Sequence, residues 1–319
     1  MDIADIKTEF GLYYKKSGQN ASRIFSQLRA KTPTTEVFTP IVTDDTIWQA
    51  GKATMTRVLQ PFQKAFTPID PLTITPAEIR MFKMKVDISE YPDDLEASWL
   101  GFLAGDEVTR KDWPFVKWYL EQHIIPQAKE DEELLEIFNG VYAAPTPGTA
   151  GAAGTSMDGI NKIILDGIAA NRIVPITTGA FNSDPELFVT QIEGFADDIN
   201  TKYWGIKMQL NMSETRARHF FRGYQKKYGK DTNYKDGKGE VPFTNLTVNG
   251  LPSMAASDGI FCTPKSNAVR LLKKTENMDK FAIENVDRQV KLYSDWWTAV
   301  GFIIPEIVFV NELFEEPGS

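Results

Sequence analysis

The sequence predicts an α+β protein, in which helices and strands occupy separate stretches of the chain. Three observations carry this prediction. A long amphipathic helix pattern spans residues 112–139, and two shorter helix patterns with start and stop signals follow at 183–200 and 213–229. From residue 244 onward, most of the chain has patterns typical of β-strands.

Composition narrows the class of protein. The 319 residues suffice for one large domain or two medium ones, and the net charge of −8 argues against an open basic surface for nucleic acid. One cysteine, Cys262, excludes an intrachain disulfide, and two histidines leave little for a metal site. The N-terminus lacks a signal-peptide pattern, and the best membrane candidate, Trp296 to Val310, is too short and contains Pro305 and Glu306.

The first 91 residues predict extended structure. Residues 1–52 are polar and rich in Thr, with prolines that favour an extended arm. Residues 53–91 predict two strands of a ribbon joined by a proline-rich tip. An edge hairpin packed on its own domain and a ribbon that needs a partner surface both remain open. The second strand alternates, with one apolar face made of Phe82, Met84, Val86 and Ile88.

The helix at 112–139 has clear signals at both ends. Asp112 is a candidate N-cap, Pro114 falls in the first turn and Gly140 is a natural stop. We expect a kink near Pro126. The acidic run "KEDEELLE" (129–136) predicts a solvated face that includes Glu132 and Glu136. The expected apolar stripe contains Phe115, Trp118, Tyr119, Ile124, Ile125, Leu134, Leu135 and Phe138.

The middle of the chain alternates between glycine-rich connections and short elements. Residues 144–156 predict a flexible hinge. A capping box of Ser183 and Glu186 opens the helix at 183–200. Ser213 caps the next helix, and Gly229 ends it. Further expected elements are a helix at 157–170, a strand at 204–212, a mobile loop at 230–240 and strands at 244–250, 259–264, 268–274, 281–294 and 296–311.

No group of residues resembles an assembled active site. Cys262 could act as a nucleophile only beside a base, and neither His123 nor His219 is placed near it by the sequence. A buried structural thiol is the favoured interpretation. The stretch "GTAGAAGTS" lacks the lysine of a phosphate-binding loop. We therefore expect no catalytic, cofactor-binding or metal-binding residues.

Two stretches resemble a known family. "LPSMAASDGIFCTPKSNAVRLLKK" (251–274) and "IENVDRQVKLYSDWWTAVGFIIPEIVFVN" (283–311) resemble closing segments of the major capsid proteins of tailed bacteriophages, which share the Hong Kong 97-like fold with encapsulins and the herpesvirus floor. The order of elements agrees along nearly the whole chain. The resemblance rests on the pattern of these segments, because this family has no catalytic motif that could be compared residue by residue.

The resemblance implies a domain organisation and a function. Trp296, Trp297 and Phe302 would pack near a spine helix at 112–139. The chain would self-assemble through hexamers and pentamers into an icosahedral shell around a double-stranded DNA genome. The implied parts are an N-terminal arm at 1–52, an extended loop over a neighbouring subunit at 53–91, a peripheral domain at 92–174, an axial domain at 175–250 and the closing strands of the peripheral domain at 251–319.

The resemblance also implies partners and alternatives. Portal, scaffolding and decoration proteins would join the shell in the virion, and DNA would be packaged without sequence-specific contacts. Because Met1 is present and about fifty residues precede the expected ribbon, we expect no cleaved scaffolding segment. Some relatives crosslink a Lys to an Asn, but nothing brings Lys64 to Asn311, so we expect no crosslink. The alternatives are an encapsulin-type compartment holding cargo, an enzyme using Cys262 and a phage tail protein.

Overall fold

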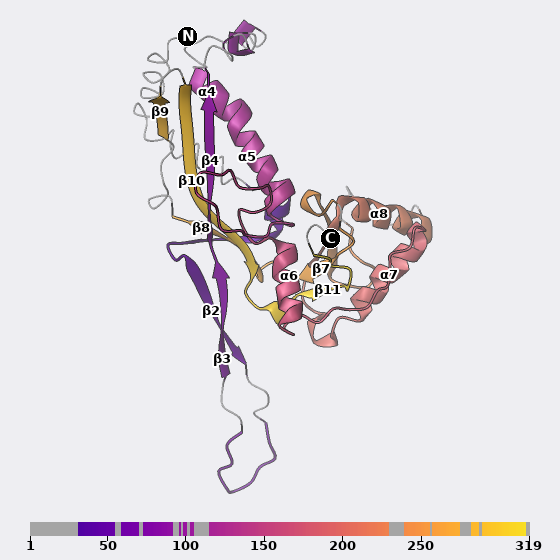
Figure 1. Ribbon diagram of the computed structural model, residues 1–319. Helices are drawn as coiled ribbons and strands as arrows, with labels where there is room; N and C mark the ends of the chain where they lie inside the picture. Colours follow the sequence, from indigo (N-terminus) through magenta and orange to yellow (C-terminus); the bar gives the residue numbers. More distant parts are fainter. Residues whose placement is uncertain are drawn as a thin grey trace.

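The computed structural model shows an elongated molecule with a compact lobe on one side and a hairpin extending beyond both (Figure 1). It describes residues 31–54, 59–69, 73–91, 96, 98–100, 103–104, 115–229, 239–255, 257–274, 282–286 and 289–316. Most of the expected arm, the start of the expected helix at Asp112 and most of the loop at 230–240 lie outside these residues. No helix in the described ranges is long and apolar enough to cross a membrane.

A five-stranded sheet forms the long body of the molecule. Its centre is β10, which pairs with β4 and β9 along its first part and with β8 along its last part, in each case antiparallel. The short β1 adds to β8 in parallel. The strands are β1 (Thr39–Thr43), β4 (Phe82–Glu90), β8 (Ala268–Lys273), β9 (Ala282–Val286) and β10 (Gln289–Phe302).

The projecting hairpin consists of β2 (Ile47–Thr54) and β3 (Thr73–Arg80), paired antiparallel. The ribbon prediction for 53–91 was therefore wrong about both strands. β2 lies mostly in the expected arm, β3 lies mostly in the expected proline-rich tip, and β4 belongs to the body sheet. The alternation itself is confirmed, since Phe82 and Met84 are buried while Lys83 and Lys85 are exposed. Alternation reveals that a strand has one covered face, but not which neighbour covers it.

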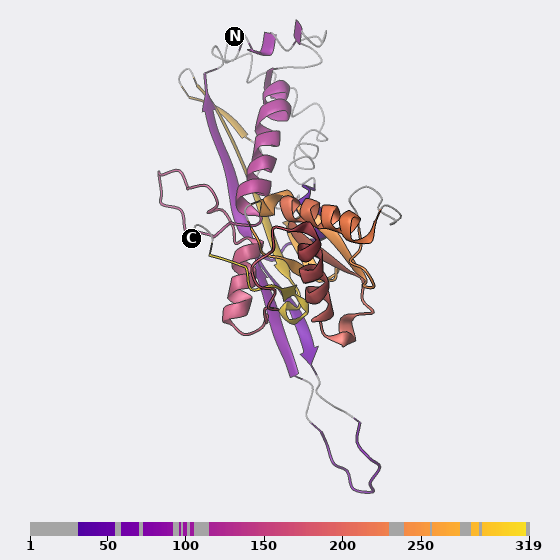
Figure 2. The same cartoon turned by 90° about the vertical axis from the view of Figure 1, so that its right-hand side faces the viewer.

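One continuous helix lies along the body sheet (Figures 1 and 2). It runs from Phe115 to Glu136 as α4 (Phe115–Tyr119), a π-helical stretch η2 (Leu120–Ile124), α5 (Ile125–Asp131) and a second π-helical stretch η3 (Glu132–Glu136). The sharp kink expected at Pro126 is absent in Figure 1. The wide turn of η2 ends two residues before this proline, which has no N–H to donate.

The two π-helical stretches change which side chains face the sheet. Leu134 and Leu135, expected in the apolar stripe, are exposed, whereas Glu132 and Glu136, expected in solvent, are buried. A π turn holds more residues than an α turn, so the faces rotate relative to a 3.6-residue pattern. This part of the helix prediction was wrong for that reason. The confirmed part of the stripe comprises Phe115, Trp118, Ile124, Ile125 and Phe138.

The lobe has its own hydrophobic core between two helices and a four-stranded sheet ordered β11-β7-β5-β6. Ser213 caps α8 and Gly229 ends it at φ 79°, as expected. The N-cap of α7 is Asp184 rather than Ser183, since the Asp184 carboxylate accepts the N–H of Glu186. The elements are α7 (Pro185–Asp197), η4 (Thr201–Tyr203), β5 (Met208–Ser213), α8 (Glu214–Tyr228), β6 (Leu246–Leu251), η5 (Pro252–Met254), β7 (Phe261–Thr263) and β11 (Phe309–Val310).

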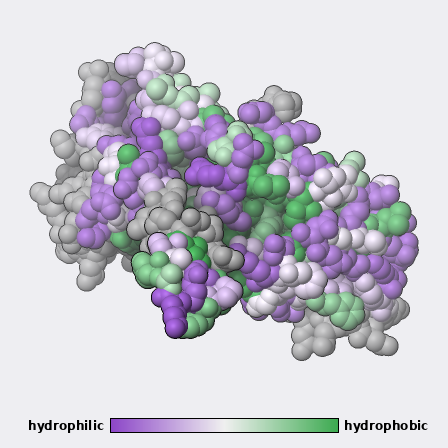
Figure 3. Space-filling model, turned by 90° about the horizontal axis from the view of Figure 1, so that it is seen from below, coloured by the Kyte–Doolittle hydropathy of each residue, from purple (hydrophilic) through white to green (hydrophobic). Residues whose placement is uncertain are grey.

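Two of these strands come from the C-terminal stretch 251–319, because β7 pairs with β5 and β11 pairs with β7. The lobe sheet therefore combines strands from well-separated parts of the chain. The short η1 (Thr34–Val37) precedes β1, η7 (Pro305–Ile307) precedes β11, and α6 (Ile160–Ala169) lies beside the body sheet in Figure 1. From below, hydrophobic residues gather where lobe and body meet (Figure 3).

The tryptophan pair in β10 points to two different faces of the sheet. Trp296 and Phe302 join the core beneath the helix, as expected. Trp297 packs in a separate cluster on the other face, where the Lys273 ammonium lies 4.5 Å from its ring centroid. The expectation that both tryptophans pack near the helix was wrong, because successive strand residues point in opposite directions.

Two glycines allow a matched test of the close packing at the end of the long helix. A Cβ at Gly140 would lie 2.4 Å from the Glu136 carbonyl oxygen and 2.6 Å from that of Met157, whereas one at Gly194 would meet nothing within 4 Å. We expect Gly140→Ala to lower the free energy of unfolding by about 1–3 kcal/mol. Gly194→Ala, inside α7, should raise it by about 0.5–1 kcal/mol. Urea unfolding of the unassembled chain measures both, and equal effects would contradict the packing around Gly140.

Candidate functional site

Three buried glutamates on the last turn of the long helix form the most unusual polar cluster among the described residues. Glu132, Glu133 and Glu136 are 4%, 6% and 7% exposed. We call these three residues the carboxylate joint. A buried carboxylate is costly unless it is paired or hydrogen-bonded, and each of the three meets a different segment of the chain.

Glu132 pairs with Arg270 of β8. The Arg270 Nη2 and Glu132 Oε1 atoms are 2.5 Å apart, and both side chains are 4% exposed. Burial raises the pKa of Glu132 above its usual value, although the Arg270 guanidinium opposes that change. The Arg270 Nε is buried without a partner among the described residues. Removing either partner would leave a buried charge without compensation.

Glu133 holds the segment that leads into β1. Its carboxylate accepts hydrogen bonds from the backbone N–H of Thr34 at 3.1 Å and from the Thr34 hydroxyl at 2.5 Å. The Ser253 hydroxyl lies 2.7 Å from the same Thr34 oxygen. Because Thr34 donates its proton to the carboxylate, Ser253 must donate to Thr34. Glu133 thereby joins the helix to η1 and to η5.

Glu136 holds the glycine-rich segment. Its carboxylate accepts the backbone N–H groups of Gly154 at 3.1 Å and Ser156 at 2.9 Å, together with the Ser156 hydroxyl at 2.9 Å. The Val141 N–H also bonds to the Gly154 carbonyl at 2.8 Å. These bonds tie down the end of a segment that we expected to be a flexible hinge. The joint thus connects four chain segments to one helix turn.

The carboxylate joint is suited to holding segments together rather than to catalysis, because its oxygens are engaged by protein donors. Its residues appear in the sequence as the charged run "KEDEELLE", which is also the signature of an exposed helix face. Only the π-helical turn places three of its glutamates inside. Among the described residues, no group of three or more His, Cys, Asp and Glu could hold a metal ion.

Cys262 lies in the middle of the lobe sheet and is fully buried. Burial raises the pKa of its thiol, so the thiolate needed for nucleophilic attack is disfavoured. Each histidine instead lies beside an aromatic ring. The ring centroids of His123 and Trp118 are 4.6 Å apart, and those of His219 and Phe188 are 5.2 Å apart. The structure therefore does not assemble a Cys–His pair.

Asn311, considered above for a crosslink, has an internal role. Its side-chain oxygen accepts the N–H of Ile260 at 2.8 Å, and its amide donates to the Asp258 carbonyl at 3.1 Å. It is completely buried, whereas Lys64 lies in the exposed loop between β2 and β3.

The loop between β2 and β3 lies far from the body (Figures 1 and 2), and several of its apolar side chains are exposed. We call residues 59–69 the hairpin tip. Leu59 is 85% exposed, and Phe62 and Phe66 are each 93% exposed. The Gln60 amide donates to the Thr67 carbonyl at 2.7 Å, which closes the loop. Large exposed apolar side chains gathered in one place mark an interaction surface.

Comparison with known proteins shows the fold. No family model and no curated protein sequence matches the chain. Solved structures of phage capsids do match over most of the chain. The satellite phage P4 procapsid, which includes the size determination protein Sid, matches with a TM-score of 0.55 at 11% identity, covering 92% of this chain and 90% of that one.

Two further solved structures agree with this match. The capsid of Myoviridae phage XM1 has a TM-score of 0.51 at 11% identity, covering 85% of this chain and 88% of that one. The capsid of cyanophage A-1(L) has a TM-score of 0.52 at 11% identity, covering 89% and 93%. The chain therefore has the α+β, Hong Kong 97-like fold of phage capsid proteins, and the resemblance inferred from residues 251–274 and 283–311 is confirmed as one of fold.

The buried pair in the joint makes a direct prediction. Arg270→Met should lower the free energy of unfolding at pH 7 by about 3–5 kcal/mol, because Glu132 would remain buried without its partner. The double variant Glu132→Leu/Arg270→Met should recover most of that loss. Chemical unfolding of the unassembled chains measures both, and a double variant no more stable than the single one would contradict this account.

The stability of the single variant Arg270→Met should also depend on pH. Without Arg270, burial would hold the pKa of Glu132 in the folded chain further above its unfolded value. The folded chain then binds a proton that the unfolded chain has released, so stability should rise as the pH is lowered from 7 toward the unfolded pKa. Unfolding of Arg270→Met between pH 7 and 5 tests this, with Glu132→Leu/Arg270→Met as the control that lacks the titrating group.

Proposed function

We propose that this chain is a major capsid protein. It self-assembles through hexamers and pentamers into an icosahedral shell that encloses the double-stranded DNA genome of a tailed phage. The fold shared with three phage capsid structures supports this proposal. The observation that carries it is the projecting hairpin, whose tip exposes Leu59, Phe62 and Phe66.

The hairpin has a physical need for another molecule. A two-stranded ribbon is marginally stable alone, and its tip points away from the body (Figures 1 and 2). The tip side chains therefore cannot be buried by the chain that carries them. A second copy supplies a surface for the tip and presents its own tip to a third, which is the head-to-tail arrangement that builds rings and shells.

The proposed partners follow from charge and from the proposed shell. A chain with a net charge of −8 does not grip phosphate tightly, so packaged DNA touches the shell without sequence-specific contacts. Portal, scaffolding and decoration proteins attach to the shell, which assembles in the host cytoplasm and is part of the virion. The chain has no enzymatic role, so Cys262→Ser leaves assembly unchanged.

The first experiment is size-exclusion chromatography with light scattering on the purified chain, followed by negative-stain microscopy of the heaviest fraction. Closed polyhedral shells, or hexamers and pentamers, support the proposal. Shells that enclose a co-purified protein instead of DNA would favour an encapsulin-type compartment. If the chain remained a strict monomer at high concentration and with crowding agents, the proposal that it forms a shell would be overturned.

Removing the aromatic rings from the hairpin tip should block assembly without affecting the fold. Phe62→Ser/Phe66→Ser should raise the protein concentration needed for assembly at least about tenfold, because two aromatic rings no longer find burial. The circular dichroism spectrum should not change, since both rings are 93% exposed. Val174→Ser, at a site that is 75% exposed and outside the tip, is the matched control. Assembly of the double variant at the wild-type concentration would refute this role of the tip.

A further inference from the structure

A hollow of about 200 Å³ lies at the base of the projecting hairpin, between β3, α6 and the end of β10. We call it the basal hollow. Segments far apart in the chain meet around it, and most of its lining is apolar. The large apolar side chains that line it are Ile79, Phe82, Ile163, Ile173, Val300 and Phe302.

Close packing fixes the shape of the basal hollow. Ile79 lies directly over Gly301, because a Cβ added to this glycine would come within 2.8 Å of the isoleucine side chain. Ile173 lies over Gly167 in the same way, with a corresponding distance of 2.6 Å. Walls that already touch the backbone of their neighbours cannot move inward to fill the space. The hollow is therefore formed in advance, as small-molecule sites usually are.

Arginine side chains line the hollow near both ends of α6. The Arg80 guanidinium carbon lies 5.7 Å from the ring centroid of Phe82 and 5.9 Å from that of Tyr142. The Tyr142 N–H bonds to Asp158, just before the start of α6, and Arg172 follows the end of that helix. Neither guanidinium forms an ion pair or donates a hydrogen bond to any residue in the described ranges.

The carboxylates of the hollow, in contrast, already have donors. Asp158 accepts the backbone N–H of Tyr142 at 3.0 Å, and Glu78 accepts the side-chain amide of Gln49 at 2.8 Å. A guanidinium offers several N–H donors in a planar fork and accepts nothing. Although the formal charges of the four side chains balance, the groups that still lack partners are donors. The basal hollow therefore suits a ligand that brings a negatively charged acceptor.

The rest of the ligand follows from the lining and the volume. A planar carboxylate matches the guanidinium fork through two parallel hydrogen bonds. The apolar walls suit a hydrocarbon chain attached to that carboxylate. Since a water molecule takes about 30 Å³ in the liquid, the hollow has room for on the order of seven groups of that size. A short-chain carboxylic acid has both the chemistry and the dimensions.

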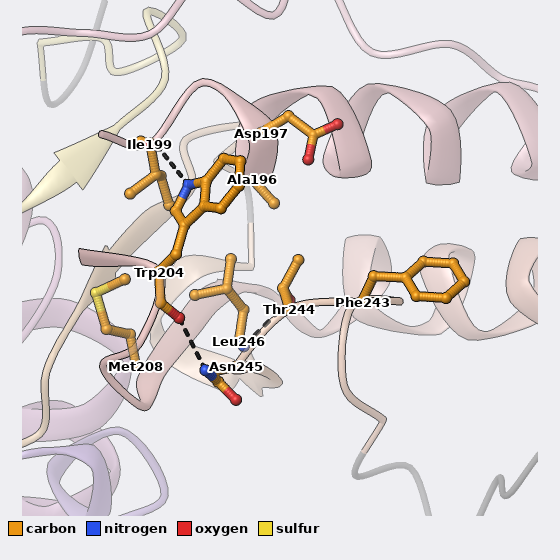
Figure 4. A pocket seen from close by; sticks show the side chains of 9 residues that line it. All are labelled: Ala196, Asp197, Ile199, Trp204, Met208, Phe243, Thr244, Asn245 and Leu246. Atoms are coloured by element: carbon orange, nitrogen blue, oxygen red, sulfur yellow. Dashed lines mark hydrogen bonds between the residues drawn. The ribbon is translucent and has the colours of Figure 1, made fainter. Parts of the chain in front are cut away.

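A smaller hollow in the lobe has the opposite character (Figure 4). It holds about 60 Å³ between Trp204, Met208 and Leu246, and the charged residue in its lining is Asp197. An apolar space beside a carboxylate, with no cation in its lining, does not attract an anion. Binding that depends on a negative charge therefore distinguishes the basal hollow from this one.

We propose that the basal hollow binds a small carboxylic acid with an apolar chain, in its ionised form. The carboxylate pairs with Arg80, whose guanidinium already packs beside two aromatic rings, and the chain lies between Ile79 and Ile163. Arg172 adds positive charge at the other end of α6. The bound molecule connects β3 to α6 and β10, and so fixes the direction in which the hairpin projects. This inference does not depend on the proposed shell function.

Three probes that share one hydrocarbon chain test the ligand chemistry. Hexanoate should raise the melting temperature of the unassembled chain in a saturable manner, because it binds the folded state. Hexanol should bind at least about tenfold more weakly, since it lacks the charge-assisted hydrogen bonds, and hexylammonium should show no saturable effect. Titration calorimetry measures the affinities. The absence of saturable hexanoate binding, or equal affinities for hexanoate and hexanol, would overturn the inference.

Arg80→Gln tests the place of binding. Arg80 is exposed, so the variant should fold normally, and its affinity for hexanoate should fall at least about tenfold while its affinity for hexanol stays the same. Arg222→Gln, at an exposed position of α8, is the matched control and should bind hexanoate as the wild type does. Hydrogen exchange should slow at residues 77–80 and 163–167 when hexanoate is bound. Unchanged affinity in Arg80→Gln, or slowed exchange in the lobe alone, would place the ligand elsewhere and overturn the inference.

Discussion

The buried pair of Glu132 and Arg270 is the constraint on which the rest of the structure depends. It joins the end of the long helix to β8, and β8 lies between β1 and β10 in the body sheet. The neighbouring Glu133 and Glu136 extend this connection to η1, η5 and the glycine-rich segment. Such an arrangement contributes more to a unique geometry than to stability, because burying charges offsets much of their attraction.

A rigid body holds an exposed contact surface in a fixed position relative to the rest of the subunit. The hairpin tip exposes two phenylalanine rings on a loop that the hydrogen bond from Gln60 to Thr67 closes. This surface is small, and it lies on a part that extends from the body (Figure 1). Several small contacts on a rigid subunit let a shell form cooperatively while two separate copies stay apart, which is the behaviour expected of the proposed capsid protein.

Much of the fold could be predicted from local patterns. The caps of α8 and the apolar face of β4 follow from residue spacing alone, whereas the core position of Trp296 was implied by the family resemblance. The carboxylate joint could not be predicted, because glutamates in a charged run resemble a solvated face. Its burial depends on π-helical turns, on Arg270 and on Thr34, which is 99 residues from Glu133 in the chain.

The sequence by itself determined most of the helical segments, the apolar face of β4 and the apolar stripe of the first half of the long helix, because these properties depend on neighbours within a few residues. Tertiary structure alone decided that β4 joins β10 rather than the hairpin, that β7 and β11 complete the lobe sheet, and that three glutamates turn inward. These outcomes depend on contacts between residues far apart in the chain. The free energy of such contacts comes from burial and charge pairing that no short window of sequence contains.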